Sequence, residues 1–391
     1  MHVIHSSPRP SRRALALPLA CMLIVASSCR DQVATPFEPA LGVLHQGAGE
    51  ATPFGVYTQN VFLGGDTGPL FTIEDFTDLE QVLAATGPFW ADVVSSDIPA
   101  RTAAFVDEID RRRPQVVALQ EVLRFVLLDG QFQPVGGLDL LAEIESGLAA
   151  RALPYETAVV QDGTSSTLPL AFDPAVGVTT WLSFTDRIVV LKRTDVTTLE
   201  SAQGRYAAGF DLGPLELVRG WARLTVDHGG VPHHLVATHL ETQAILPVHS
   251  AQAEELQNDI VAGLDGVTII AGDLNSDAEA EMSAPSWTPT YGNLIAAGFT
   301  DIWSTSPRSR NATGFTCCHD PSLGDGRVLD ERIDFVMVRS SAAVANGREM
   351  QRGFFRADLF GDDAAHRTDS GLWPSDHAGI IATLRIPPPW L

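Results

Sequence analysis

Short runs of apolar residues, each bounded by polar ones, recur along the chain and predict buried strands. Between the first two runs, Phe105, Val106 and Ile109 recur at helical spacing with charged residues outside them, which predicts a helix. Further helices are expected at about 137–150 and 248–264. The expected strands cover residues 56–62, 115–119, 187–191, 221–226, 234–238, 267–271, 333–338 and 378–384.

These strands and helices follow one another without strict alternation. Such an order favours an α/β fold with two packed mixed β-sheets flanked by helices over a parallel wound sheet. Two segments, 64–100 and 352–374, have the composition of insertions, with many Gly, Asp and aromatic residues. Both are expected near the loops that carry the polar motifs, so they are candidates for substrate selection.

The N-terminus has the pattern of an export signal, because arginines precede an apolar run that is too short to cross a bilayer as a helix. Cys29 follows small residues and resembles a bacterial lipoprotein cleavage site, so a membrane anchor at Cys29 is favoured over plain secretion. The expected organisation is a signal peptide at 1–28, a flexible tether at 29–54 and one folded domain at 55–391.

The chain is strongly acidic, with 26 Lys and Arg against 48 Asp and Glu and a formal net charge of −22. Such a protein repels polyanions unless a local basic patch intervenes, whereas nucleic-acid binders usually present a basic face. The basic cluster at 111–113 is expected at the end of a helix, where cations also favour the helix dipole. Solubility in a salty environment is an alternative reason for the acidity.

Cys317 and Cys318 are the cysteines of the expected folded domain. After export they can form a vicinal disulfide or remain two thiols, and the bond requires a special turn because adjacent residues in extended backbone point apart. A closed zinc site is not expected, because no second cysteine pair is present to complete four ligands.

Polar residues gather at the ends of the expected strands. Asn60 and Glu121 end two of them, and four blocks follow: Thr-His-Leu-Glu at 238–241, Gly-Asp-Leu-Asn at 272–275, Glu-Arg-Ile-Asp at 331–334 and Ser-Asp-His at 375–377. Carboxylate and amide oxygens are the ligands that hard divalent ions prefer, and such ions stabilise charge on phosphoryl oxygens. Asp273 and Asn275 are two residues apart and therefore point the same way in extended backbone, although Asx hydrogen bonds would make the same turn purely structural.

The order of these blocks resembles the endonuclease/exonuclease/phosphatase superfamily, over about residues 55–386. The resemblance implies a four-layer α/β sandwich and a hydrolase of phosphate esters, either a phosphodiesterase or a phosphatase. It implies Mg²⁺ as the cofactor, with Mn²⁺ or Ca²⁺ able to substitute, and it makes 55–391 the catalytic domain.

The same resemblance implies a role for each polar residue. Glu121 would be the principal metal ligand, with Asn60 beside it and Asp376 completing the metal shell. Asp273 would orient or deprotonate the attacking water, and Asn275 would hold phosphate. His239 and His377 would donate hydrogen bonds to phosphoryl oxygens, with Asp186 as the carboxylate partner of His239 and Asp334 as that of His377. Arg219 would contact phosphate, although a surface salt bridge is a close alternative for this arginine.

The substrate is left open among DNA, lipid, inositol phosphate and nucleotide esters, with small or lipid phosphoesters favoured. An extracellular DNA endonuclease of the same superfamily is one alternative, and a non-catalytic phosphoester-binding protein is another. The second is disfavoured because every block keeps its ionisable residue. The protein is expected to be a monomer.

Overall fold

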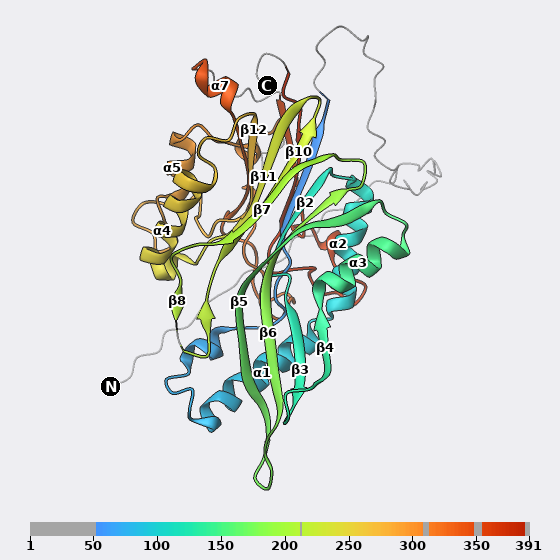
Figure 1. Ribbon diagram of the computed structural model, residues 1–391, viewed down its shortest axis with the longest axis vertical. Coiled ribbons are helices and arrows are strands. Elements are labelled where there is room, and N and C mark those ends of the chain that lie inside the picture. Colours follow the sequence, from blue (N-terminus) through green and yellow to red (C-terminus); the bar gives the residue numbers. More distant parts are fainter. Residues whose placement is uncertain (1–51, 212, 308–312, 348–353, 388–391) are drawn as a thin grey trace, which may run out of the picture. The chain divides into compact units, whose positions relative to one another are not determined.

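Two mixed β-sheets form the centre of the fold (Figure 1). They are seen in a computed structural model that describes residues 52–211, 213–307, 313–347 and 354–387. The predicted signal peptide lies outside these residues, as does nearly all of the predicted tether. In the part of the chain that is described, no helix has the length and apolar character needed to cross a membrane.

The first sheet has ten strands, with a parallel pair, β1 and β2, inside an otherwise antiparallel arrangement. Its order is β15 (Phe355–Phe360), β16 (Gly379–Leu384), β1 (Phe54–Asn60), β2 (Val116–Gln120), β6 (Gly177–Arg193), β5 (Tyr155–Asp173), β9 (Glu216–Leu217) and β8 (Phe210–Asp211). The hairpin of β3 (Arg124–Asp129) and β4 (Pro134–Asp139) joins this sheet through β6.

The second sheet has six strands, and its parallel pair is β11 and β12. Its order is β13 (Thr300–Asp301), β14 (Asp334–Ser340), β12 (Val267–Asp273), β11 (Val231–His239), β10 (Gly220–His228) and β7 (Thr198–Arg205). Each of the strand ranges predicted from the apolar runs overlaps a strand of one of the two sheets, so these predictions are confirmed.

Alternating side chains of the central strands build separate cores on the two faces of the first sheet. In β2, Val116 and Ala118 pack between the sheets together with residues of the second sheet such as Leu224. Val117 and Leu119 point to the opposite face, where they pack under the helices. This period of two is what an extended strand buried on both faces requires.

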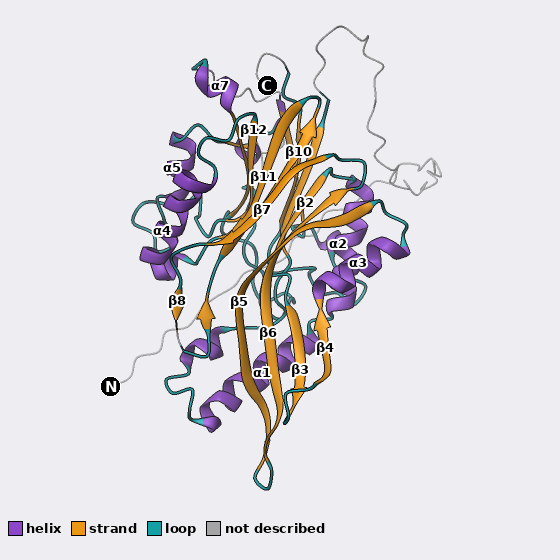
Figure 2. Ribbon diagram, in the orientation of Figure 1, coloured by secondary structure: helices purple, strands orange, loops and turns teal. Residues whose placement is uncertain are grey.

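Helices cover the outer face of each sheet, as Figure 2 shows in purple. Over the first sheet lie α1 (Leu79–Ser95), α2 (Ile98–Arg112) and α3 (Leu140–Ala150), and their apolar side chains share one core with β2 and β6. Over the second lie α4 (Leu246–Glu255), the π-helix Leu256–Ile260 and α5 (Thr290–Ala296), which share another core with β11, β12 and β14. Helix, sheet, sheet and helix therefore form the predicted layers.

Short helices complete the described elements: 3-10 helices at Gly68–Thr72, Gln243–Ile245 and Ala364–His366, and α-helices α6 (Ile302–Thr305) and α7 (Ser341–Ala345). The longer helices begin at aspartates. Asp78 accepts the backbone N–H groups of Glu80 and Gln81 at the start of α1, and Asp139 does the same for α3. Such caps satisfy amides that have no partner within the helix.

The two segments predicted as insertions contain core elements. All of α1 falls inside 64–100, and its Val82, Phe89 and Val93 are buried in the core under the first sheet. The sequence pattern did not predict this helix because it contains an interior proline, Pro88, and proline normally interrupts a helix. Segment 352–374 contains β15, an edge strand of the first sheet. Their predicted part in substrate selection stays a prediction.

Candidate active site

The strand register brings polar residues from both sheets together. In the first sheet, Asn60 ends β1 opposite the last residue of β2, and Glu121 follows that residue. In the second sheet, Asp273 ends β12 opposite both His239, the last residue of β11, and Asp334, the first residue of β14. The two groups meet, because Asn60 Nδ2 lies 3.2 Å from Asp273 Oδ2.

Asp273 is the centre of the site and is 2 % exposed. Its Oδ2 accepts a hydrogen bond from Asn60, and the Nε2 atoms of His239 and His377 lie 3.4 and 3.9 Å from the same oxygen. Burial, reinforced by the nearby Asp334 carboxylate, raises the pKa of Asp273 to about 7. A carboxyl group that titrates near neutrality is suited to take a proton from water.

His377 is held by Asp334, which confirms the predicted pairing. Its Nδ1 donates to Asp334 Oδ2 at 2.8 Å, so Nε2 is the nitrogen that faces Asp273. Burial alone would lower the pKa of His377, but the carboxylates of Asp334 and Asp376 raise it well above its ordinary value. The two carboxylates therefore favour the imidazolium form of His377, whose Nε2–H faces the centre of the site.

His239 lies in a different environment from the predicted one. Its Nδ1 is 3.1 Å from an amino nitrogen of Arg219, which can only donate, so this ring nitrogen carries no proton and Nε2 carries one. Burial lowers the pKa of His239 well below its ordinary value, and Arg219 and His377 add to this effect. His239 is thus a neutral donor whose N–H faces Asp273, and the predicted carboxylate partner, Asp186, is replaced by Arg219.

Asp186 instead contacts Arg219, across 3.7 Å, in a partly buried cluster that also contains Glu241. The two guanidinium–Glu241 hydrogen bonds are each 3.4 Å long. Burial, and to a smaller extent the charge of Glu121, raises the pKa of Asp186 to about 6 against the opposite effect of Arg219. Arg219 is therefore neither a surface salt bridge nor an unengaged cation, and its predicted contact with phosphate stays a prediction.

Glu121 and Asn60 lie together at the edge of the first sheet. Asn60 Nδ2 donates to Glu121 Oε1 at 2.9 Å, and the backbone N–H of Leu63 donates to Glu121 Oε2 at 2.9 Å. The amide oxygen of Asn60 accepts the backbone N–H of Phe62 at 3.0 Å. In this arrangement Asn60 presents its nitrogen to the carboxylates, so binding a metal through its oxygen would require the amide to turn, and its ligand role stays a prediction.

Asp376 belongs to the same edge of the site. Burial and the charge of Glu121 raise its pKa to about 6, while His377 and Arg101 act in the opposite direction. Ser375 holds the loop, since its hydroxyl donates to Asn60 O at 2.7 Å and accepts the N–H of His377 at 3.1 Å. Ser375 therefore caps the loop that carries Asp376 and His377.

Asn275 completes the turn after β12 in a left-handed conformation, with φ of 47°. Its backbone N–H donates to Asp273 Oδ1 at 2.9 Å, and its side-chain nitrogen donates to Leu240 O at 2.9 Å. The first contact is an Asx hydrogen bond, the interaction expected if the turn has a purely structural role. Asn275 thus fixes the loop beside Asp273, and its predicted contact with phosphate stays a prediction.

Cys317 and Cys318 are paired as a vicinal disulfide, one of the two states that the sequence allows. The bond lies in the site, because Cys318 Sγ is 3.7 Å from His377 Nε2. The surrounding segment is attached to the Ser-Asp-His loop, with His319 N donating to Asp376 O and Ala378 N donating to Thr316 O, both at 2.7 Å.

Glu241 and Arg101 are buried charges at the site that were not among the predicted residues. Glu241 is the last residue of the Thr-His-Leu-Glu block, so its sequence neighbours already pointed to it. Arg101 has no such motif. The available signal was an arginine at helical spacing from Ile98 and Phe105, on the face of the helix that must be buried.

The residues present suit a hard divalent cation. Glu121, Asp376 and Asp273 offer carboxylate oxygens, and burial raises the pKa values of Asp273 and Asp376, so a bound cation would favour their ionised forms. Asp273, Asp334 and His377 also have ligand atoms within 4.8 Å of one another, but Asp334 and His377 are already bonded to each other. Glu121 and Asp376 therefore remain the best candidates for metal ligands.

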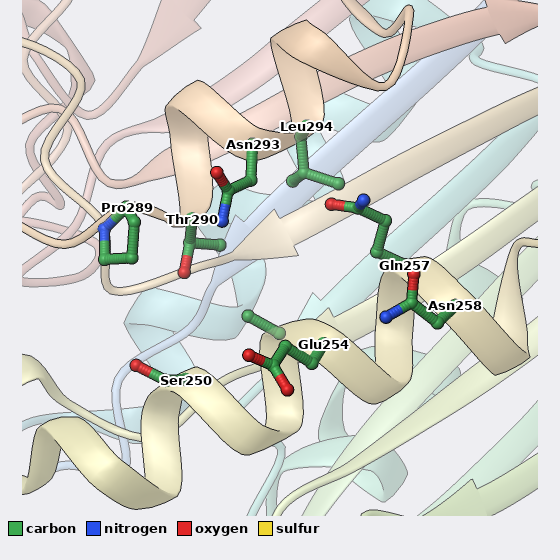
Figure 3. Close-up of a pocket in the computed structure, with 9 residues that line it drawn as sticks. Ser250, Glu254, Gln257, Asn258, Pro289, Thr290, Asn293 and Leu294 are labelled. Atoms are coloured by element: carbon green, nitrogen blue, oxygen red, sulfur yellow. The ribbon is translucent and has the colours of Figure 1, made fainter.

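A surface pocket between α4 and α5 lies apart from these residues (Figure 3). It is lined by side chains such as Ser250, Glu254 and Asn293, and none of the predicted site residues contributes to it. The polar strand ends, rather than this pocket, therefore form the candidate active site.

No protein-family model matches the sequence, and no curated protein matches it either. Solved structures do match. An endonuclease/exonuclease/phosphatase family protein from Leptotrichia buccalis has a TM-score of 0.51 at 13 % identity, over 84 % of this chain and 98 % of that one. An endonuclease/exonuclease/phosphatase from Beutenbergia cavernae has a TM-score of 0.49 at 19 % identity, over 85 % of this chain and 71 % of that one. Truncated TDP2 from Caenorhabditis elegans has a TM-score of 0.47 at 19 % identity, over 85 % of this chain and 97 % of that one.

The likeness to the Leptotrichia protein agrees with the two mixed sheets and their flanking helices. This chain has the endonuclease/exonuclease/phosphatase fold, as its polar blocks implied.

Proposed function

We propose that this protein hydrolyses phosphate esters with the help of a bound divalent metal ion. The observation that supports it best is the convergence of Asn60, His239 and His377 on the buried carboxylate of Asp273. Phosphoester hydrolysis requires a base for water, donors for the phosphoryl oxygens and a positive charge for the leaving oxygen. The site offers the first two from its own side chains.

Glu121 and Asp376 would hold the metal, with Asn60 beside them. The ion, of which Mg²⁺ is the expected form, would supply positive charge to the phosphoryl and leaving oxygens. Asp273 takes the proton from the attacking water, because its pKa of about 7 leaves much of it ionised at neutral pH.

The two histidines differ in charge but point the same way. His377 is an imidazolium fixed by Asp334 and donates from Nε2 to a phosphoryl oxygen. His239 is neutral and donates from its own Nε2, because Arg219 occupies Nδ1. Fixed donors of this kind stabilise developing negative charge without having to reorganise during the reaction.

We infer that small or lipid phosphoesters are better substrates than long duplex DNA. Duplex binding depends on cations that contact successive phosphates. The basic cluster of α2 does not offer such cations freely: Arg111 and Arg112 pair with Glu108, and Arg113 pairs with Asp110. With a net charge of −22, the protein has little else to attract a polyanion.

The substrate class is tested by comparing catalytic efficiency on plasmid DNA, sphingomyelin, inositol phosphates and bis-nitrophenyl phosphate at matched salt and Mg²⁺. We expect at least one small or lipid ester to be hydrolysed with a kcat/KM about tenfold or more above that for plasmid phosphodiesters. The Asp273→Asn variant serves as the blank for contaminating nucleases. Efficient plasmid cleavage with no turnover of the small esters would reverse the ranking and favour the DNA endonuclease.

We further propose that the protein is exported and anchored to a membrane through a lipid on Cys29, which lies outside the described residues. The motivation is the run of small residues before Cys29 and the segment rich in proline and polar residues behind it. Metabolic labelling with a fatty acid should mark the wild type and not Cys29→Ser. An unlabelled mature protein that begins at another residue would refute the anchor.

A further inference from the structure

Arg101 of α2 is a fully buried cation behind the proposed metal ligands, 1 % exposed. Its guanidinium donates to backbone carbonyls on two loops that are far apart in sequence. Nε donates to Pro374 O at 2.8 Å, and one amino nitrogen donates to Phe62 O at 2.7 Å and also contacts Val61 O. The other amino nitrogen donates to Ser96 Oγ at 3.0 Å.

These two loops carry the proposed ligands. The loop after β1 orients Glu121, because Leu63 N, one residue beyond the carbonyl that Arg101 binds, donates to Glu121 Oε2. The loop before β16 runs from Pro374 directly into Ser375 and Asp376. One guanidinium group therefore joins the two loops that carry the ligands, in addition to the hydrogen bond from Ser375 to Asn60 O.

Packing alone does not explain an arginine here. A buried cation is costly, and a well-packed apolar side chain of similar volume is often as stable or more so. Its planar fork of donors, however, can bind several carbonyls at once. Burial lowers the pKa of Arg101, but only to about 10, and among the charges that oppose the change Asp376 and Glu121 have the largest effects. Arg101 thus stays charged beside the two carboxylates.

We propose that Arg101 is a positioning residue that assembles Glu121 and Asp376 into a metal site before the metal binds. This inference rests on the proposed metal-dependent function and adds a residue to it. Its role is carried by geometry: a lysine at this position keeps the charge but cannot reach Pro374 O, Phe62 O and Val61 O with one rigid fork.

The test is the binding of Mn²⁺, measured by electron paramagnetic resonance without substrate, in the wild type and in Arg101→Lys. We expect Arg101→Lys to raise the Kd for Mn²⁺ about 10- to 100-fold, the usual effect of losing a group that orients metal ligands. Turnover at saturating Mn²⁺ should recover to within a few-fold of wild type. Arg111→Lys is the matched control on the same helix, because Arg111 is exposed and pairs only locally with Glu108.

If Arg101→Lys fails to fold, a second variant, Ser96→Ala, tests the same positioning role. Ser96→Ala removes one hydrogen-bond partner of the guanidinium and leaves its three carbonyl contacts, so we expect the Kd for Mn²⁺ to rise about 2- to 10-fold. A Kd within twofold of wild type in the folded variants would overturn the positioning role. A wild-type protein that binds no Mn²⁺ would instead contradict the proposed metal site itself, which separates the two failures.

Discussion

Replacing Asp273 with asparagine, or His377 with glutamine, is expected to lower the turnover of a phosphodiester by about two to four orders of magnitude. Asp273→Asn keeps the shape of the side chain and an oxygen for the backbone N–H of Asn275, but it removes the group that accepts the proton. His377→Gln keeps a donor toward Asp334 and removes the imidazolium that faces the centre of the site. Both changes therefore act on chemistry more than on folding.

The measurement is kcat for bis-nitrophenyl phosphate at saturating Mg²⁺, with circular dichroism to establish that each variant is folded. Asp195→Asn and His228→Gln are matched controls, because both residues lie away from the cluster and neither contacts Asp273 or His377. The controls should stay within twofold of wild type. A folded Asp273→Asn or His377→Gln that keeps more than about a tenth of wild-type turnover would show that the residue does not act in catalysis.

Removing the metal should have an equally large effect, and Glu121→Gln should reproduce part of it. Glu121 and Asp376 are partly buried and interact electrostatically with each other, and each is held by loop contacts rather than by a hydrogen-bonded cation. A divalent ion would neutralise them and polarise the phosphoryl oxygens. Glutamine at position 121 keeps one oxygen but loses the charge, so we expect its activity to require about tenfold or more Mg²⁺ than wild type does.

The fold and the centre of the site could be predicted because they depend on local patterns. Apolar runs marked the strands, and the polar residues that follow them had to meet where parallel strands end at the same edge. His377 and Asp334 reach the same edge from the opposite direction: Asp334 begins β14 and His377 precedes β16, and each of these strands is antiparallel to a neighbour whose last residue lies in the site. The layers followed from the mixture of strand and helix patterns.

The partners of the individual side chains could not be predicted, because they depend on strand register. Arg219 directly precedes β10, in which Gly220 is paired with His239. Only this pairing shows that the Arg219 guanidinium, rather than the expected Asp186 carboxylate, contacts the His239 ring. The contacts of Arg101 depend on how α2 packs against two loops, and no local sequence pattern contains this information. Helix α1 was missed because Pro88 interrupts its pattern while its neighbours still pack in the core.

Metal dependence is tested most directly by assaying one preparation of wild-type protein on bis-nitrophenyl phosphate three times: as purified, in excess chelator, and after Mg²⁺ is added beyond the chelator. A metal-dependent phosphoesterase built on Glu121, Asp376 and Asp273 predicts that hydrolysis falls to the blank in chelator. It predicts that Mg²⁺ restores hydrolysis in the wild type but not in Asp273→Asn. Undiminished hydrolysis in excess chelator would contradict the proposed mechanism.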